Sequence, residues 1–179
     1  MHELTEHELY LALEYAKSLD EHKGRRILMG FETDQPLLFQ TLFSVFPGII
    51  AEQNQDLAHY FMDLCFEVIC VYQHAFGAPP KFADDPTWME RQAVLMGEEF
   101  HAVMNNKVLD EAGKKQLQAQ FMGTGGTQVQ AGLARFMNES IDEFAAQAIS
   151  RVESVQFTQA MVWMVIRLFN NLYDQPVKH

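Results

Sequence analysis

Residues 49–76 read IIAEQNQDLAHYFMDLCFEVICVYQHAF, and this stretch decides the fold class of the chain. It contains no proline or glycine, and its apolar residues recur with the period of an α-helix. Most of its circumference is apolar, whereas an ordinary surface helix carries a single apolar stripe. The stretch is therefore predicted to be the long central helix of an all-α protein, with other helices packed on most of its sides.

The polar residues of this helix fall on one stripe, roughly 80° wide on a helical wheel. The stripe consists of Glu52, Asp56, His59, Asp63, Glu67, Cys70 and His74. No lysine or arginine occurs between Ile27 and Pro80, so nothing nearby in the sequence offsets the like charges at i,i+4 spacing. Water, a basic residue from another segment, a metal ion or a basic partner is expected to face this stripe.

Two acid–histidine pairs at i,i+3 spacing make a metal site one of these alternatives. Glu98 and His101 form one pair, Asp56 and His59 form the other, and Asp63 follows further along the stripe. Carboxylate-bridged dimetal bundles use this spacing on two helices, because side chains at i and i+3 share a face. Candidate ligands elsewhere in the chain are Glu14, Glu139, Asp142 and Glu143. The hypothesis is a divalent-metal or di-iron centre inside the bundle, with Asp in one position where the template has Glu.

The rest of the chain predicts further helices, about six to seven in a single domain spanning residues 1–179. They are expected over residues 5–20, 34–46, 86–106, 110–122, 128–148 and 150–173. Thr5 and Glu8 have capping-box spacing at the first of these starts. The cationic, glycine-containing turn 23–26 is expected to end the first helix, and Pro47 to end the second. No alternation typical of strands occurs, so the predicted fold is an all-α, single-domain, multi-helix bundle.

Charge and cysteine content restrict the partners and the location of the protein. The formal net charge is −11, which argues against nucleic-acid and anionic-membrane binding, since both need clustered lysine and arginine. No secretory signal is recognisable, and no apolar run approaches the ~20 residues that cross a bilayer. The two cysteines, Cys65 and Cys70, point in different directions on a helix and cannot pair within it. A cytoplasmic protein without nucleic-acid or membrane binding is expected.

The sequence favours binding over catalysis. It contains no nucleophile elbow, P-loop, His-Glu-x-x-His pair or EF-hand loop. Phenylalanine and methionine are abundant, and both fill cores and line adaptable binding surfaces. The last helix has a broad apolar arc, suited to the core or to a homodimer seam: Phe157, Met161, Met164, Val165, Leu168 and Phe169. The leading hypothesis is a non-enzymatic interaction module that binds a second copy or another protein, and the alternative is the dimetal-type bundle.

Overall fold

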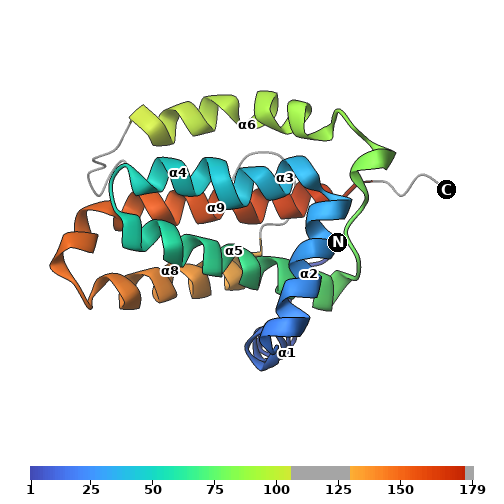
Figure 1. Ribbon diagram of the computed structural model, residues 1–179, viewed down its shortest axis with the longest axis horizontal. Coiled ribbons are helices and arrows are strands. Elements are labelled where there is room, and N and C mark those ends of the chain that lie inside the picture. Colours follow the sequence, from blue (N-terminus) through green and yellow to red (C-terminus); the bar gives the residue numbers. More distant parts are fainter. Residues whose placement is uncertain (106–129, 176–179) are drawn as a thin grey trace.

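The described part of the protein is helical throughout (Figure 1). The computed structural model describes residues 1–105 and 130–175, and of residues 98–100 and 102–105 it describes the backbone only. Its α-helices are α1 (Glu6–Ser18), α2 (Glu21–Asp34), α3 (Pro36–Gln40), α4 (Phe46–Ala51), α5 (Gln55–Phe76), α6 (Trp88–Asn105), α8 (Ala131–Ala145) and α9 (Val155–Tyr173). Between them lie a π-helical segment and two 3₁₀ segments, namely Thr41–Val45, Phe82–Asp84 and Ile149–Ser154. No strand occurs in these ranges, and the all-α prediction is confirmed; the helix expected over 110–122 lies outside them.

Helix α5 is the predicted central helix, although it begins at Gln55 and not at residue 49. Asn54 caps its first turn, because the Asn54 side chain accepts a hydrogen bond from the Leu57 amide (2.9 Å). Gly77 ends the helix at φ +88°, a backbone angle that favours glycine. Helix α5 contacts α1, α4 and α9, and these neighbours cover its apolar circumference.

Helix α9 is the second buried helix and packs against α5 and α8. The apolar arc expected on it lies in the core of the same chain, since its six named residues are all buried. An aromatic cluster joins its C-terminal half to α5 and α2 through Phe31, Tyr72, Phe76, Phe169 and Tyr173. The hydroxyl of Tyr72 donates to Oδ1 of Asn170 across 2.7 Å inside this cluster. The arc therefore holds the bundle together and presents no exposed seam for a second copy.

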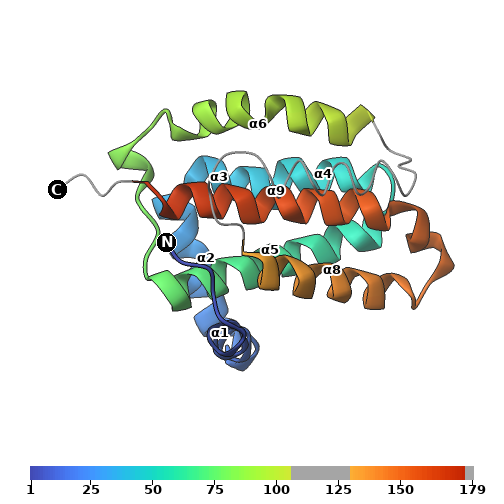
Figure 2. The ribbon, with the colours of Figure 1, turned by 180° about the vertical axis from the view of Figure 1, so that it is seen from behind.

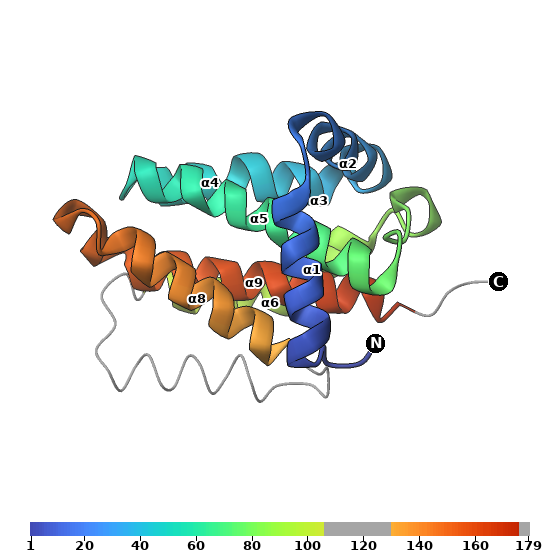
Figure 3. The same ribbon diagram turned by 90° about the horizontal axis from the view of Figure 1, so that it is seen from below.

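The predicted end of the first helix is wrong, because the cationic turn 23–26 lies inside α2. The carboxylate of Asp20 accepts a hydrogen bond from the Lys23 amide (2.8 Å) and caps α2, so α1 has already ended at Ser18. Helix α2 buries only Phe31 and lies across one end of the bundle (Figure 3). Ile27 and Leu28 of this helix are partly buried against the same core, so these three side chains hold α2 to the bundle.

The predicted break at Pro47 is also wrong. Helix α3, the π-helical segment and α4 form one continuous helical path from Pro36 to Ala51. Proline offers no N–H to the carbonyl of residue 43 and crowds it, but the turn before it is widened. The Phe46 amide donates to the Thr41 carbonyl, five residues back, as in a π-helix. The widened turn also keeps a row of apolar residues at four-residue spacing in the core: Leu38, Leu42, Phe46 and Ile50.

The helices form a bundle with α9 near its middle. Helix α6 packs on α9, on the side of α9 away from α8 (Figures 1 and 2). Helix α1 crosses α5 near one end of the bundle and also contacts α8 (Figure 3). None of the helices in the described ranges is both long and apolar enough to cross a membrane. This arrangement leaves grooves on both sides of α1, where it meets α8 and where it meets α2.

Candidate functional site

The N-terminal end of the acidic stripe of α5 faces a basic residue from another segment. Nη2 and Nε of Arg151 lie 2.9 Å and 3.2 Å from Oδ2 of Asp56. The same guanidinium lies over the ring of Phe144, with its Cζ 3.9 Å from the ring centroid, and Nη1 donates to the Phe144 carbonyl. At Asp56 the acidic stripe is therefore faced by a basic residue from another segment, which is one of the four alternatives expected from the sequence.

The middle of the stripe faces solvent and α1. Asp63 is exposed, and partial burial raises the pKa of its carboxyl while the nearby His59 opposes that rise. Glu67 is half-buried, and burial raises its pKa, with Lys17 of α1 lowering it and Asp63 raising it further. Lys17 therefore offsets part of the negative charge at Glu67, and Asp63 is exposed to solvent, which screens its charge.

The C-terminal end of the stripe has no reactive cysteine. Cys70 is buried, and burial together with the charge of Glu67 raises the pKa of its thiol to about 12. The ring of His74 stacks on Tyr15 of α1, with 4.7 Å between the ring centroids. A cysteine whose thiol stays protonated in this way packs as a core side chain and does not act as a nucleophile, because the nucleophilic form is the thiolate.

The residues predicted to bind metal are not gathered by the described structure. His59 is exposed, and its Nε2 accepts a hydrogen bond from the Gln55 amide (3.1 Å). His101 is exposed on α6, which lies across α9 and α4 from α5 (Figure 1). Glu98 belongs to α6, but its side chain is outside the described part. Among the residues that are described, no three His, Cys, Asp or Glu side chains could hold a metal ion together.

Two further acids that the metal hypothesis named, Glu14 and Glu139, lie instead on a groove between α1 and α8. This α1–α8 groove has a volume of about 500 Å³. Apolar residues line its inside, and acidic and basic residues line its edges: Glu3, Leu4, Glu6, Leu9, Tyr10, Leu13, Glu14, Lys17, Ala131, Gly132, Arg135, Phe136 and Glu139. Leu4, Leu9 and Leu13 are buried, whereas Tyr10 keeps 59% of its surface exposed at the edge.

The edges of the α1–α8 groove carry more negative than positive charge. Four glutamates and two cations line it, and the two ion pairs there, Lys17 with Glu14 and Arg135 with Glu6, are loose at 3.9 Å. Glu139 is exposed and has no ion-pair partner in the described ranges, and the same holds for Glu3. The groove therefore has carboxylates that are available to a ligand.

A buried glutamine fixes the end of the groove. Gln130 is 1% exposed; its Oε1 accepts from the Leu4 amide (2.8 Å) and its Nε2 donates to the His2 carbonyl (2.8 Å). An added Cβ on Gly132 would meet Cδ2 of Leu9 at 3.4 Å, so α8 approaches α1 closely beside this anchor. The sequence around Gln130 and Gly132 does not reveal these contacts, because they depend on how α8 meets the N-terminal segment and α1.

Comparisons with protein families, curated proteins and solved structures found no match to this chain. The all-α bundle alone does not define a function, since one fold supports many activities. The functional conclusion therefore rests on the chemistry of the described surfaces.

Proposed function

We propose that this protein is a non-enzymatic interaction module that binds a basic segment of a partner protein in the α1–α8 groove. The observation that carries the proposal is the pairing of an apolar floor with the carboxylates of Glu3 and Glu139, which are exposed and have no ion-pair partner in the described ranges. Leucine, tyrosine and phenylalanine side chains would hold an apolar anchor of the partner. Lysine or arginine on either side of that anchor would meet Glu3 and Glu139.

The overall charge of the protein supports a basic partner. A net charge of −11 attracts a cationic segment over a distance and raises its association rate. The same charge repels a second copy of this chain, so we favour a different protein over a homodimer. The two free cysteines are buried and need no oxidising compartment, and we place the interaction in the cytoplasm on that ground.

Fluorescence anisotropy with a labelled peptide tests the proposal. The probe is a synthetic amphipathic peptide of leucine and lysine, and its control has glutamate in place of every lysine. We expect the basic peptide to bind and the acidic peptide not to bind. Glu139→Lys is expected to weaken binding by about tenfold, since one close charge pair is replaced by a repulsion.

A matched variant separates the groove from net charge. Glu90→Lys changes the charge of the protein equally but lies on α6, away from the groove. Tyr10→Ala tests the apolar part, and the similarly exposed Leu95→Ala on α6 is its control. The proposal is wrong if Glu90→Lys weakens binding as much as Glu139→Lys. It is also wrong if gel filtration shows a dimer that Glu139→Lys dissociates, because the occupant is then a second copy.

A further inference from the structure

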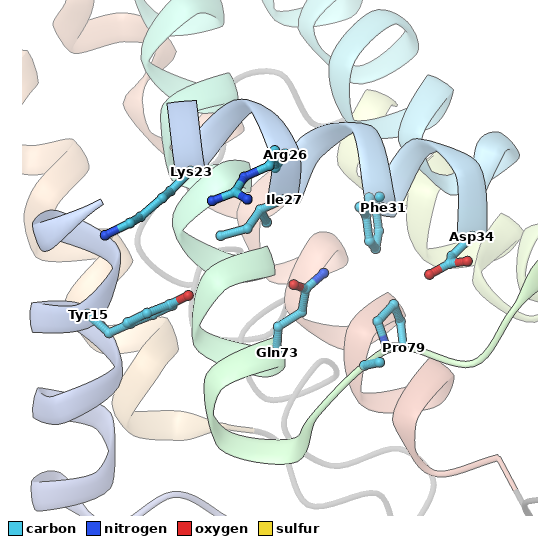
Figure 4. A pocket seen from close by; sticks show the side chains of 10 residues that line it. Tyr15, Lys23, Arg26, Ile27, Phe31, Asp34, Gln73 and Pro79 are labelled. Carbon is cyan, nitrogen blue, oxygen red and sulfur yellow. The ribbon is translucent and has the colours of Figure 1, made fainter. Parts of the chain in front are cut away.

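A second cavity lies on the other side of α1, between α1, α2 and the end of α5 (Figure 4). Its volume is about 470 Å³, within the range of small-molecule sites. We call it the α2 pocket. It is lined by Tyr15, Lys23, Arg26, Ile27, Gly30, Phe31, Asp34, Gln73, Ala78 and Pro79. None of these residues lines the α1–α8 groove, so the two sites are chemically separate.

Three hydrogen-bonding groups in the α2 pocket have no described partner. The neighbouring cations are paired, Lys23 with Asp20 and Arg25 with Glu21, but Arg26 has no ion pair within the described ranges. Figure 4 shows the Arg26 guanidinium on the same side of the pocket as the Tyr15 hydroxyl, above the Gln73 amide. In the part of the chain that is described, neither the Tyr15 hydroxyl nor the Gln73 amide forms a hydrogen bond. These donors are available to one anionic group.

The charges of α2 are only partly arranged as its macrodipole favours. Asp20 caps the helix and Glu21 lies in its first turn, which is favourable, and Lys23, Arg25 and Arg26 follow them. The last turn has no basic residue and contains Glu32 and Asp34, which is unfavourable. Of the three cations, Arg26 is the one without an ion pair in the described ranges, so its charge is available to a ligand.

The opposite half of the pocket is apolar and ends at a carboxylate. Phe31 is 1% exposed and lies opposite Pro79, and Ile27 lies one turn earlier on α2, next to Arg26 (Figure 4). The segment that carries Pro79 is fixed, because Nε2 of Gln35 donates to the Pro80 carbonyl. Asp34 closes this end and pairs with Lys81 at 3.7 Å. A second negative charge on a ligand would meet Asp34, so the pocket suits one negative charge on an apolar body.

We propose that the α2 pocket binds a small amphipathic monocarboxylate. Its carboxylate would accept hydrogen bonds from Arg26, from the Gln73 amide and from the Tyr15 hydroxyl. Arginine binds a carboxylate with two parallel hydrogen bonds, as it also binds phosphate. The carboxylate of Asp34 in the lining favours a ligand with a single negative charge over a phosphate dianion. The apolar body of the ligand would lie on Ile27 and Ala78, next to the buried Phe31 and Pro79.

Isothermal titration and NMR shifts on the full chain test this assignment. The probes are phenylacetate and the straight-chain carboxylates from butanoate to octanoate, with phenylacetamide as the uncharged control and inorganic phosphate as the anion without an apolar body. We expect the carboxylates to bind and phenylacetamide and phosphate to bind at least about tenfold more weakly. Arg26→Gln is expected to weaken carboxylate binding by about tenfold or more.

Two matched variants keep the test selective. Arg25→Gln removes an adjacent arginine that lines no part of the pocket, and we expect the carboxylate affinity to stay within about twofold of wild type. Gly30→Leu places a side chain at the pocket wall, where an added Cβ meets nothing within 4 Å. Gly48→Leu is the control: it makes the same substitution at an equally open position on α4, outside the pocket. Only Gly30→Leu is expected to reduce binding. The proposal is overturned if the Arg25 and Arg26 variants lose affinity equally, if phosphate binds better than every carboxylate, or if no carboxylate binds.

Discussion

The guanidinium of Arg151 lies 2.9 Å from the carboxylate of Asp56, although 95 residues separate them in the chain. The side chain of Arg151 is 15% exposed, whereas that of Asp56 is 57% exposed, so the arginine is the more deeply placed partner. Arg151 also stacks on Phe144, whose ring lies against Tyr60 with 4.1 Å between centroids. One arginine thus connects α5, α8 and the 3₁₀ segment before α9.

Replacing this arginine should destabilise the fold more than replacing its acidic partner. Arg151→Met keeps an apolar stem but removes the stacking cation, the ion pair and the bond to the Phe144 carbonyl. We expect a loss of about 1–2 kcal/mol in the free energy of unfolding, measured in urea. Asp56→Asn should cost less than about 1 kcal/mol, because that carboxylate is exposed. Equal losses in the two variants would contradict the assignment of the deeper role to Arg151.

Two glycines of α2 should respond oppositely to alanine. Gly30 has open space at its Cβ position, so Gly30→Ala should raise stability by about 0.5–1 kcal/mol through helix propensity. At Gly24 an added Cβ would lie 3.3 Å from Cζ of Phe66, and the contact should cancel that gain. Urea unfolding of both variants checks this, and an equal gain at both positions would mean that α2 does not approach α5 as closely as described.

The buried hydroxyl of Tyr72 should be needed for stability. Tyr72→Phe removes the donor to Oδ1 of Asn170 and leaves that acceptor unsatisfied in the core, at an expected cost of about 1–3 kcal/mol. Tyr10→Phe is the control, because the Tyr10 side chain is 59% exposed and should be neutral. Thermal and chemical unfolding of the two variants gives the comparison, and a neutral Tyr72→Phe would show that the hydrogen bond contributes nothing.

Glu67 should make the protein less stable as the pH rises above the ordinary glutamate range. Burial raises the pKa of Glu67 above its ordinary value of 4.5, so between these two pKa values the folded state binds more protons than the unfolded state. Stability therefore decreases as pH rises through this window. Glu67→Gln should be more stable than wild type near neutral pH, and the difference should disappear below the ordinary value. Unfolding measured over that pH range tests this, with the exposed Glu52→Gln as a control that should show little change.

The sequence predicts the fold class correctly because residues 49–76 are apolar around far more of the helix circumference than in an ordinary surface helix. A helix that is apolar around most of its circumference can only be satisfied by neighbours on several sides, and α5 has them. The boundaries are harder to predict, because single side chains decide them. Asp20 starts α2 three residues before the expected cationic turn, and the widened turn before Pro47 follows from packing and not from any local motif.

The candidate sites were only partly predictable. The stripe on α5 and the availability of an arginine elsewhere follow from sequence, but which arginine reaches Asp56 depends on how residues 149–154 fold back. Glu14 and Glu139 can be named from the sequence as candidate ligands. That they line the edges of one groove follows only from the packing of α1 against α8. The α2 pocket escapes prediction for a similar reason, since its residues come from three segments and Arg26 reads as part of a turn.

The π-helical segment between α3 and α4 has a consequence for insertions and deletions. It contains one residue more than an α-helix would need to connect the same two ends. A chain that lost one residue there could connect the same two ends as a regular α-helix, so Phe46 and Ile50 would stay on the buried face. Pro47 would then crowd the carbonyl four residues before it, because the widened turn that makes room for it would be gone. A chain that gained one residue would instead turn every later side chain on that path by about 100° around the axis and rotate Phe46 and Ile50 out of the core. This short segment is therefore expected to tolerate a deletion better than an insertion.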